Sequence, residues 1–222
     1  MSLLTPQIGS QLVDLGSALL LLTCFAIVAQ RRLSACVDLF ALQSLFLALT
    51  AALVAFLTGI HHIYIAAALT FGIKVVFIPR ILKQVIERLN VKRELEMNVN
   101  VPTGLLTCGA LVILAFFITQ PIIPLGFLLT RDSLAIALAI ILIGFFTMIA
   151  RKKAVTQVIG FLVRENGLFL GATAAAYGTP LIVELGVFFD VLVGALIIGI
   201  YTHRLQDAFD SVDTSKLTTL KE

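Results

Sequence analysis

Seven long apolar stretches restrict what this sequence can fold into. They cover approximately residues 13–30, 35–58, 63–81, 103–123, 133–150, 156–177 and 181–201. A helix of about 20 apolar residues matches the hydrocarbon core of a bilayer. Only helices and closed barrels satisfy the backbone inside lipid, and runs this long do not alternate with the period of a strand. The sequence therefore predicts an all-α integral membrane protein with about seven transmembrane helices.

The composition excludes an ordinary soluble domain. Hydrophobic residues make up 59% of the 222-residue chain and charged residues only 13%, whereas soluble domains average about 25% charged residues. The first 16 residues contain no Lys or Arg, so we expect them to lead into a retained first helix, not a cleaved signal. Cys24, Cys36 and Cys108 have neither metal-binding nor disulfide spacing, and we expect them to be small buried apolar side chains.

The basic residues predict an orientation. Of the 16 Lys and Arg residues, 13 follow the first, third, fifth or seventh stretch. These are Arg31, Arg32, Arg80, Lys83, Arg88, Lys92, Arg93, Arg151, Lys152, Lys153, Arg204, Lys216 and Lys221. The connections on the opposite side contain only Arg131. Because basic residues accumulate on the cytoplasmic side, the N-terminus is predicted outside and the C-terminus inside.

The predicted organisation has five segments. They are helices 1–3 in residues 1–82, a polar cytoplasmic connection in 83–102, helix 4 in 103–130, helices 5–7 in 131–203 and a cytoplasmic tail in 204–222. The polar connection could be an amphipathic helix on the membrane surface or a solvated linker. The first and last three helices share a layout of basic clusters and mid-helix polar residues. Helix 4 would keep both units in one orientation, which predicts parallel repeats.

Three charged residues are predicted near the bilayer midplane, and they are Glu165, Asp190 and Lys74. A charged side chain at that depth costs about 3 kcal/mol on insertion scales, so it needs a partner, water or a function. Burial raises the pKa of a carboxylic acid and lowers that of an amine, which lets such groups exchange protons near neutral pH. We predict that they form part of a proton path. The alternative is a static ion pair of Lys74 with either acid.

Other polar residues are secondary candidates. Glu184 lies near the outer end of its helix, either as a hydrated carboxylate or at the outer mouth of the path. Arg164 points about 100° away from Glu165 around the helix, toward packing contacts or a carboxylate of another subunit. Gln43 corresponds in position to Glu165 within the first repeat unit. Asp38 is expected to pair with Arg31, Arg32 or solvent.

Gly160, Gly167 and Gly171 fall on one face of the sixth stretch, which predicts a close approach of a neighbouring helix beside Glu165. The paired histidines at 61 and 62 are expected to anchor a helix end at the interface. The sequence contains no Walker loop, dinucleotide fingerprint or zinc-protease motif. We therefore expect no catalytic residue, cofactor or metal in this chain.

The residues of helices 6 and 7 resemble those of the hydrogenase-4 component E family. The resemblance is carried by residues 160–167, with the sequence GFLVRENG, and by residues 181–194, with the sequence LIVELGVFFDVLVG. It extends to Arg32-Leu33-Ser34, Gln43-Ser44, Lys74-Val75-Val76 and residues 217–221. Helices 5–7 are also similar to the K subunit of complex I and the C subunit of multisubunit Na⁺/H⁺ antiporters. In that pattern Glu165 matches a glutamate of the middle helix, and Asp190 with Gly194 matches a second acid, which is here Asp instead of Glu.

The resemblance implies a multi-pass, non-redox subunit of a group 4 NiFe hydrogenase of the formate hydrogenlyase type, in the cytoplasmic (inner) membrane of a prokaryote. It implies that the chain contributes to proton translocation and complex assembly. The implied partners are antiporter-like membrane subunits, a membrane anchor subunit, the hydrogenase large and small subunits and Fe–S subunits. The NiFe centre and the Fe–S clusters would lie in those partners. The alternatives are a subunit of a multisubunit cation/proton antiporter and a purely structural assembly subunit.

Overall fold

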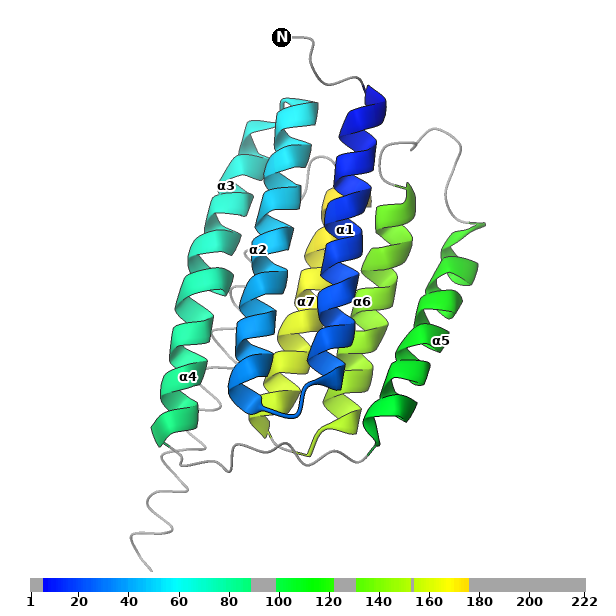
Figure 1. Cartoon of the computed structure of the whole chain (residues 1–222). Helices are drawn as coiled ribbons and strands as arrows, with labels where there is room; N and C mark the ends of the chain where they lie inside the picture. Colours follow the sequence, from blue (N-terminus) through cyan, green and yellow to red (C-terminus); the bar gives the residue numbers. More distant parts are fainter. Residues whose placement is uncertain (1–5, 89–98, 122–130, 153, 176–222) are drawn as a thin grey trace, which may run out of the picture. The chain divides into compact units, whose positions relative to one another are not determined.

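The computed structural model describes residues 6–88, 99–121, 131–152 and 154–175, and every regular element in them is helical (Figure 1). The elements are α1 (Pro6–Ala29), α2 (Leu33–Thr58), α3 (His61–Thr70), the π-helix η1 (Phe71–Phe77), α4 (Ile78–Arg88), α5 (Val101–Thr119), α6 (Arg131–Ala150) and α7 (Ala154–Ala175). α3, η1 and α4 follow one another without a break and form one continuous rod. The predicted all-α fold is confirmed for the described residues.

Five helical segments of the described residues are long and apolar enough to cross a membrane. They are Ile8–Ala29, Leu33–Thr58, Ile63–Gln84, Val101–Thr119 and Asp132–Ala150. α7 has 22 residues and corresponds to the sixth predicted span, but the polar run from Arg164 to Asn166 lowers its hydropathy. The seventh predicted span, 181–201, lies outside the described residues.

Two helix boundaries differ from those predicted. α1 begins at Pro6, and α4 continues to Arg88, whereas the apolar stretches suggested a start at residue 13 and an end at residue 81. The last turns of α4 carry the exposed side chains of Lys83, Gln84 and Glu87. An apolar stretch marks the length of helix that suits lipid, and the backbone continues its hydrogen bonding beyond that length.

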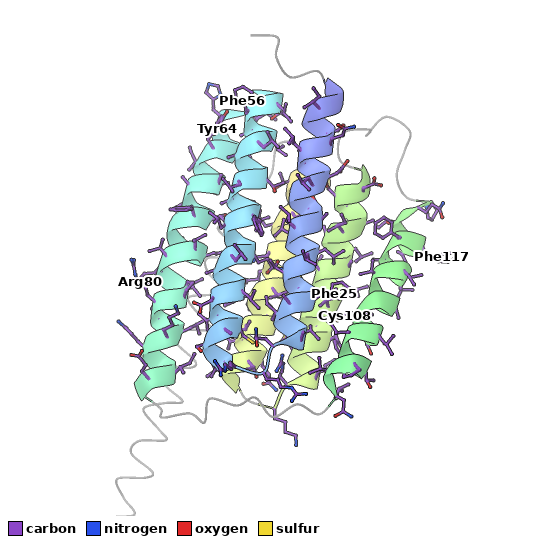
Figure 2. All side chains as sticks on the ribbon, viewed as in Figure 1. Phe25, Phe56, Tyr64, Arg80, Cys108 and Phe117 are labelled. Atoms are coloured by element: carbon purple, nitrogen blue, oxygen red, sulfur yellow. The ribbon has the colours of Figure 1, made fainter. Side chains whose placement is uncertain are left out.

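The described helices pack side by side around α1, α2, α6 and α7 (Figure 1). α6 and α7 share the largest interface, α2 contacts both α1 and α7, and α1 contacts α6. The rod of α3, η1 and α4 packs against α2, and α5 packs against α6 and α1. Only 17% of the α5 span is buried, compared with 56% of the α6 span, so α5 is peripheral. Figure 2 shows Phe117 pointing outward from α5, while Cys108 lies on the side of α5 that faces α1.

Glycines allow α6 and α7 to approach closely. A Cβ atom at Gly144 would lie 2.7 Å from the backbone nitrogen of Arg164, and one at Gly160 would lie 2.9 Å from that of Met148. A Cβ at Gly167 would lie 2.9 Å from the backbone nitrogen of Ile141. These distances are too short for any side chain, so the two backbones are in direct contact. The predicted close approach beside Glu165 is confirmed for Gly160 and Gly167.

The basic end of the bundle is held together by contacts that span the chain. Arg151, in the α6–α7 connection, donates from Nη2 to the carbonyl oxygens of Ile27, Val28 and Gln30 at 3.0, 3.1 and 3.0 Å. Lys83 Nζ lies 2.6 Å from Asp38 Oδ1, with both side chains largely exposed. Asp38 therefore pairs with Lys83 of α4 and not with Arg31 or Arg32, while its side chain is also open to solvent, the third partner that was expected. The sequence did not reveal that α4 continues along α2 far enough to present Lys83.

Candidate functional site

Lys74 lies on the π-helical segment η1, in the third predicted span. A π-helical turn is rare and is frequently found at functional sites. The Lys74 side chain is 2% exposed, and its Nζ donates to Asn166 Oδ1 at 3.3 Å. Nζ also lies 5.9 Å from the centroid of the Phe169 ring, within the range of a cation–π contact. The predicted burial of Lys74 is thus confirmed, and its ammonium group donates to an amide oxygen.

Asn166 links Lys74 to α2. Its Nδ2 donates to Gln43 Oε1 and to Ser44 Oγ, each at 3.1 Å. Gln43 in turn donates from Nε2 to the carbonyl of Leu20 at 3.2 Å and to Cys24 Sγ at 2.8 Å. Hydrogen bonds therefore run from η1 through α7 and α2 to α1. We call the hydrogen-bonded side chains of Gln43, Ser44, Lys74 and Asn166, together with the buried Glu165 next to Asn166 on α7, the central polar network.

Glu165 is the network's carboxylate. Glu165 and Asn166 are adjacent on α7 and both are 0% exposed. Burial of an acid and an amine in one layer of a membrane bundle is costly unless the groups are paired, hydrated or functional. The network can therefore hold a proton on a carboxylate or an amine, and its amides and hydroxyl fix where the amine points. A carboxylic acid and an amine are both groups that can accept and release a proton.

Arg164 is directed away from Glu165, as predicted. Its guanidinium carbon lies 4.2 Å from the centroid of the Phe161 ring and 5.3 Å from that of Phe145. The Nε atom is buried and has no hydrogen-bond acceptor among the described residues. Arg164 therefore does not belong to the central polar network.

Two further predicted site residues are not among those that the structure describes. Glu184 and Asp190 lie outside the described residues, so their membership of the path stays a prediction. Within the described residues, no group of three or more His, Cys, Asp and Glu side chains gathers in a way that could hold a metal ion. Cys24, Cys36 and Cys108 are all buried and free, as predicted.

Sequence reasoning missed several polar residues. Asn166 and Ser44 adjoin the candidates Glu165 and Gln43 in the sequence, but the sequence did not predict their hydrogen bonds. A second polar contact joins α1 to α6: Ser17 Oγ lies 2.9 Å from Ser133 Oγ, which donates to Asp14 Oδ1 at 3.4 Å. A carboxylate inside an apolar stretch could have drawn attention to Asp14, but its partner is more than 100 residues away.

The role of Arg151 was also missed, because it looked like one member of a basic cluster. Its side chain is only 3% exposed, and it donates to carbonyls at the end of α1, where the regular helical N–H donors run out. Burial lowers the pKa of the Arg151 guanidinium from its ordinary value, while the nearby Cys36 acts in the opposite direction. Arg151 is therefore a structural cation that closes the α1 C-terminus.

The described residues define a helical membrane protein with a buried network of charged and amide side chains. Over 214 residues the chain is 34% identical to the uncharacterized protein Rv0085 of Mycobacterium tuberculosis, covering 96% of this chain and 97% of that protein. Over 216 residues it is 25% identical to hydrogenase-4 component E of Escherichia coli K12, covering 96% and 99% of the two chains. The chain therefore belongs to the same family as Rv0085, a hydrogenase-4 component E-like family of membrane proteins.

No protein-family model matches the sequence, and no solved structure matches it.

Proposed function

We propose that this chain is a membrane subunit of a hydrogenase-4-type complex and that its central polar network takes part in proton translocation. The observation that carries the proposal is the buried network, in which Lys74 bonds to Asn166 beside the fully buried Glu165. The relative named hydrogenase-4 component E supports the hydrogenase complex, because it matches nearly the whole length of both chains.

Glu165 and Lys74 are the groups that exchange protons in this proposal. Asn166 cannot store a proton, so it positions the Lys74 amine through its 3.3 Å hydrogen bond. Gln43 likewise cannot replace a carboxylate, and it anchors Asn166 to α2. Asp190 is proposed as the next member of the path, with Glu184 nearer the outer side. Antiporter-like subunits continue the route, since a single layer of charges near the midplane does not cross the membrane.

The proposal includes a place in the cell. The chain lies in the prokaryotic cytoplasmic (inner) membrane with seven helices, the N-terminus outside and the C-terminus inside. That orientation is supported by the exposed Arg31, Arg32, Lys83 and Lys152, which cluster at one end of the described bundle. The chain itself carries no redox centre, and the NiFe centre and Fe–S clusters belong to the large, small and Fe–S subunits. A membrane anchor subunit connects these to the membrane, and this chain also assists assembly.

The test is Glu165→Gln in the assembled complex. We expect proton pumping into inverted membrane vesicles to fall at least about tenfold, because Gln is similar in size but cannot release a proton. Hydrogen turnover with an artificial electron donor is expected to stay near that of the wild type, because that reaction does not require transfer across the membrane. Lys74→Met is expected to act in the same way.

Glu87→Gln provides the matched control, because Glu87 is an exposed carboxylate of α4. It should leave both pumping and hydrogen turnover unchanged. Normal pumping by the Glu165→Gln complex, at normal assembly, would rule out the relay role.

A structural role is the second candidate, and the bonding of Asn166 favours it. Its carboxamide bonds to Lys74, Gln43 and Ser44, so the network also fastens α2, η1 and α7 together. If this were its whole function, Asn166→Leu would reduce assembly while Glu165→Gln would leave pumping intact. Asn166→Leu and Glu165→Gln together therefore separate a proton-relay function from a purely structural one.

A further inference from the structure

Arg164 presents a cation on a face that has no acid among the described residues. Its guanidinium is held between the rings of Phe161 and Phe145, at 4.2 and 5.3 Å. Aromatic faces attract the positive charge but accept no strong hydrogen bond. The buried Nε atom has no acceptor within the described part of the chain. A guanidinium has five N–H donors and stays protonated in proteins, so it retains unused bonding capacity.

Arg164 also lies at the middle of its helix. It is ten residues from the start of α7 and eleven from its end, which places it about 15 Å from either end. Cations near helix ends extend to the lipid headgroups, but a residue at this depth is too far from both interfaces. An acceptor at the depth of Arg164 must therefore come from protein.

The surroundings of Arg164 form an exposed apolar face. Phe145 and Ile149 on α6 are 44% and 77% exposed, and Leu168 on α7 is 41% exposed. Together with Phe161 and Arg164, these residues form what we call the α6–α7 outer face. Lipid tails would cover the apolar side chains equally well, but they offer nothing to the guanidinium. The face therefore combines exposed apolar side chains with one cation whose Nε atom lacks an acceptor in the described residues.

We propose that the α6–α7 outer face docks a transmembrane helix of a neighbouring subunit that carries an Asp or Glu at the depth of Arg164. The carboxylate accepts two parallel hydrogen bonds from the guanidinium, the geometry in which arginine binds acids best. Phe145 and Phe161 hold the guanidinium in place before docking, which lowers the entropic cost of the contact. The inference rests on the proposed membership of a complex and identifies one of its contact sites.

The first experiment measures assembly by native gel electrophoresis of membranes dissolved in mild detergent. We expect Arg164→Met to lower the fraction of the chain that migrates with the complex at least about tenfold, because a buried acid on the partner loses its only cation. Arg164→Lys should retain part of the assembly, since Lys keeps the charge without the paired geometry. Arg80→Met is the matched control, because Arg80 is an exposed arginine of α4 that points away from the bundle (Figure 2).

The second experiment is a charge exchange. In the Arg164→Glu variant, each Asp or Glu within the transmembrane helices of the copurifying subunits is replaced by Arg, one at a time. Restored assembly by one such exchange identifies the partner helix and supports the proposal. Assembly of Arg164→Met at the wild-type level overturns it. Rescue by Glu184→Arg or Asp190→Arg also overturns it, because the acceptor would then lie in this chain.

Should Arg164→Met reduce the yield of folded chain, Leu168→Cys keeps the test open. Leu168 lies one turn from Arg164 on the same face. After the thiol of Leu168→Cys is labelled with a photoactivatable maleimide, illumination should cross-link the chain to a neighbouring subunit in the purified complex. Absence of any such cross-link would overturn the proposal. The readout here is assembly, so normal assembly of Arg164→Met refutes the docking site while leaving the Glu165 relay intact. Normal pumping by Glu165→Gln refutes the relay and leaves the docking site standing.

Discussion

At the residue scale, Asn166 controls how the central polar network is connected. One carboxamide accepts from Lys74 and donates to both Gln43 and Ser44. Glu165, its neighbour on α7, is a fully buried carboxylic acid. The two side chains therefore suit different roles: the Glu165 carboxylate suits proton exchange, and the Asn166 amide suits positioning. Arg151 likewise bonds to several groups at the basic end, where one guanidinium donates to three carbonyl oxygens.

Asn166→Leu is expected to destabilise the folded chain. Leu has a similar branched shape but removes the acceptor used by Lys74 and the donor used by Gln43, at a cost of about 1–3 kcal/mol for each buried polar group affected. Thermal unfolding in mild detergent should therefore show a lower Tm. Leu168→Ala, two residues further along α7 on its exposed side, should stay close to the wild-type Tm. An unchanged Tm for Asn166→Leu would mean that the network does not stabilise the fold.

Arg151→Met is expected to loosen the end of α1. The substitution removes three hydrogen bonds from a charged donor, and bonds of this kind contribute about 1.5–3 kcal/mol each. Hydrogen exchange at the amides of residues 28–32 should accelerate. Lys152→Met also removes one positive charge, but from an exposed neighbour, so exchange there should not change. Equal exchange in the two variants would contradict the role assigned to Arg151.

At the element scale, the contact of α6 with α7 and the π-helical turn of η1 determine where the site lies. Glycines at positions 144, 160 and 167 bring the two backbones together. This contact sets the rotation of α7, so that Asn166 points toward α2 and η1 while Arg164 points outward. The change of helical geometry over Phe71–Phe77 carries Lys74 to Asn166. The three glycines carry no charge, but together with η1 they determine where the charged side chains point.

Gly144→Ala and Gly109→Ala should have opposite effects on stability. A methyl group at Gly144 would meet the Arg164 backbone, and overpacking of this kind costs about 1–3 kcal/mol. At Gly109 on α5 nothing lies within 4 Å of the new Cβ. Ala there should be neutral or stabilise the helix by about 0.5–1 kcal/mol. Unfolding in detergent compares the two, and a Gly144→Ala chain as stable as Gly109→Ala would disprove the tight α6–α7 contact.

At the scale of the whole molecule, the described helices separate a basic end from an end with few basic residues. The connections between α1 and α2 and between α6 and α7 lie together at the basic end, joined through Arg151. The turn between α2 and α3 lies at the opposite end, where Gly59 adopts a left-handed conformation with φ of 71°. The positive-inside rule predicts that the basic end faces the cytoplasm.

Cysteine labelling tests that orientation. His61→Cys, at the end with few basic residues, should react with a membrane-impermeant maleimide in intact cells. Lys152→Cys should react only after the membrane is permeabilised. Both wild-type side chains are exposed, whereas the natural cysteines are buried and should give little background. The reverse pattern would invert the proposed topology.

The sequence predicted the helices well because lipid imposes one simple requirement on them. A run of about 20 apolar residues must hydrogen-bond to itself, so hydropathy alone located the helices of the described residues. The boundaries were less accurate where polar turns extend a helix beyond the lipid, as α4 shows. The burial of Glu165 and Lys74 was also predictable, because few charged residues occur within the apolar stretches.

The sequence by itself determined that this protein lies in a lipid bilayer, that it is helical, and which residues carry buried ionisable groups. The tertiary structure decided which of those residues meet. Asn166 joins Lys74 because α7 is rotated by its glycine contact with α6 and because η1 departs from α-helical geometry. Arg164, one residue before Glu165, is placed outside the network by the same rotation. The physical reason is that hydropathy fixes depth along a helix, while the direction of a side chain around it depends on the packing of neighbouring helices.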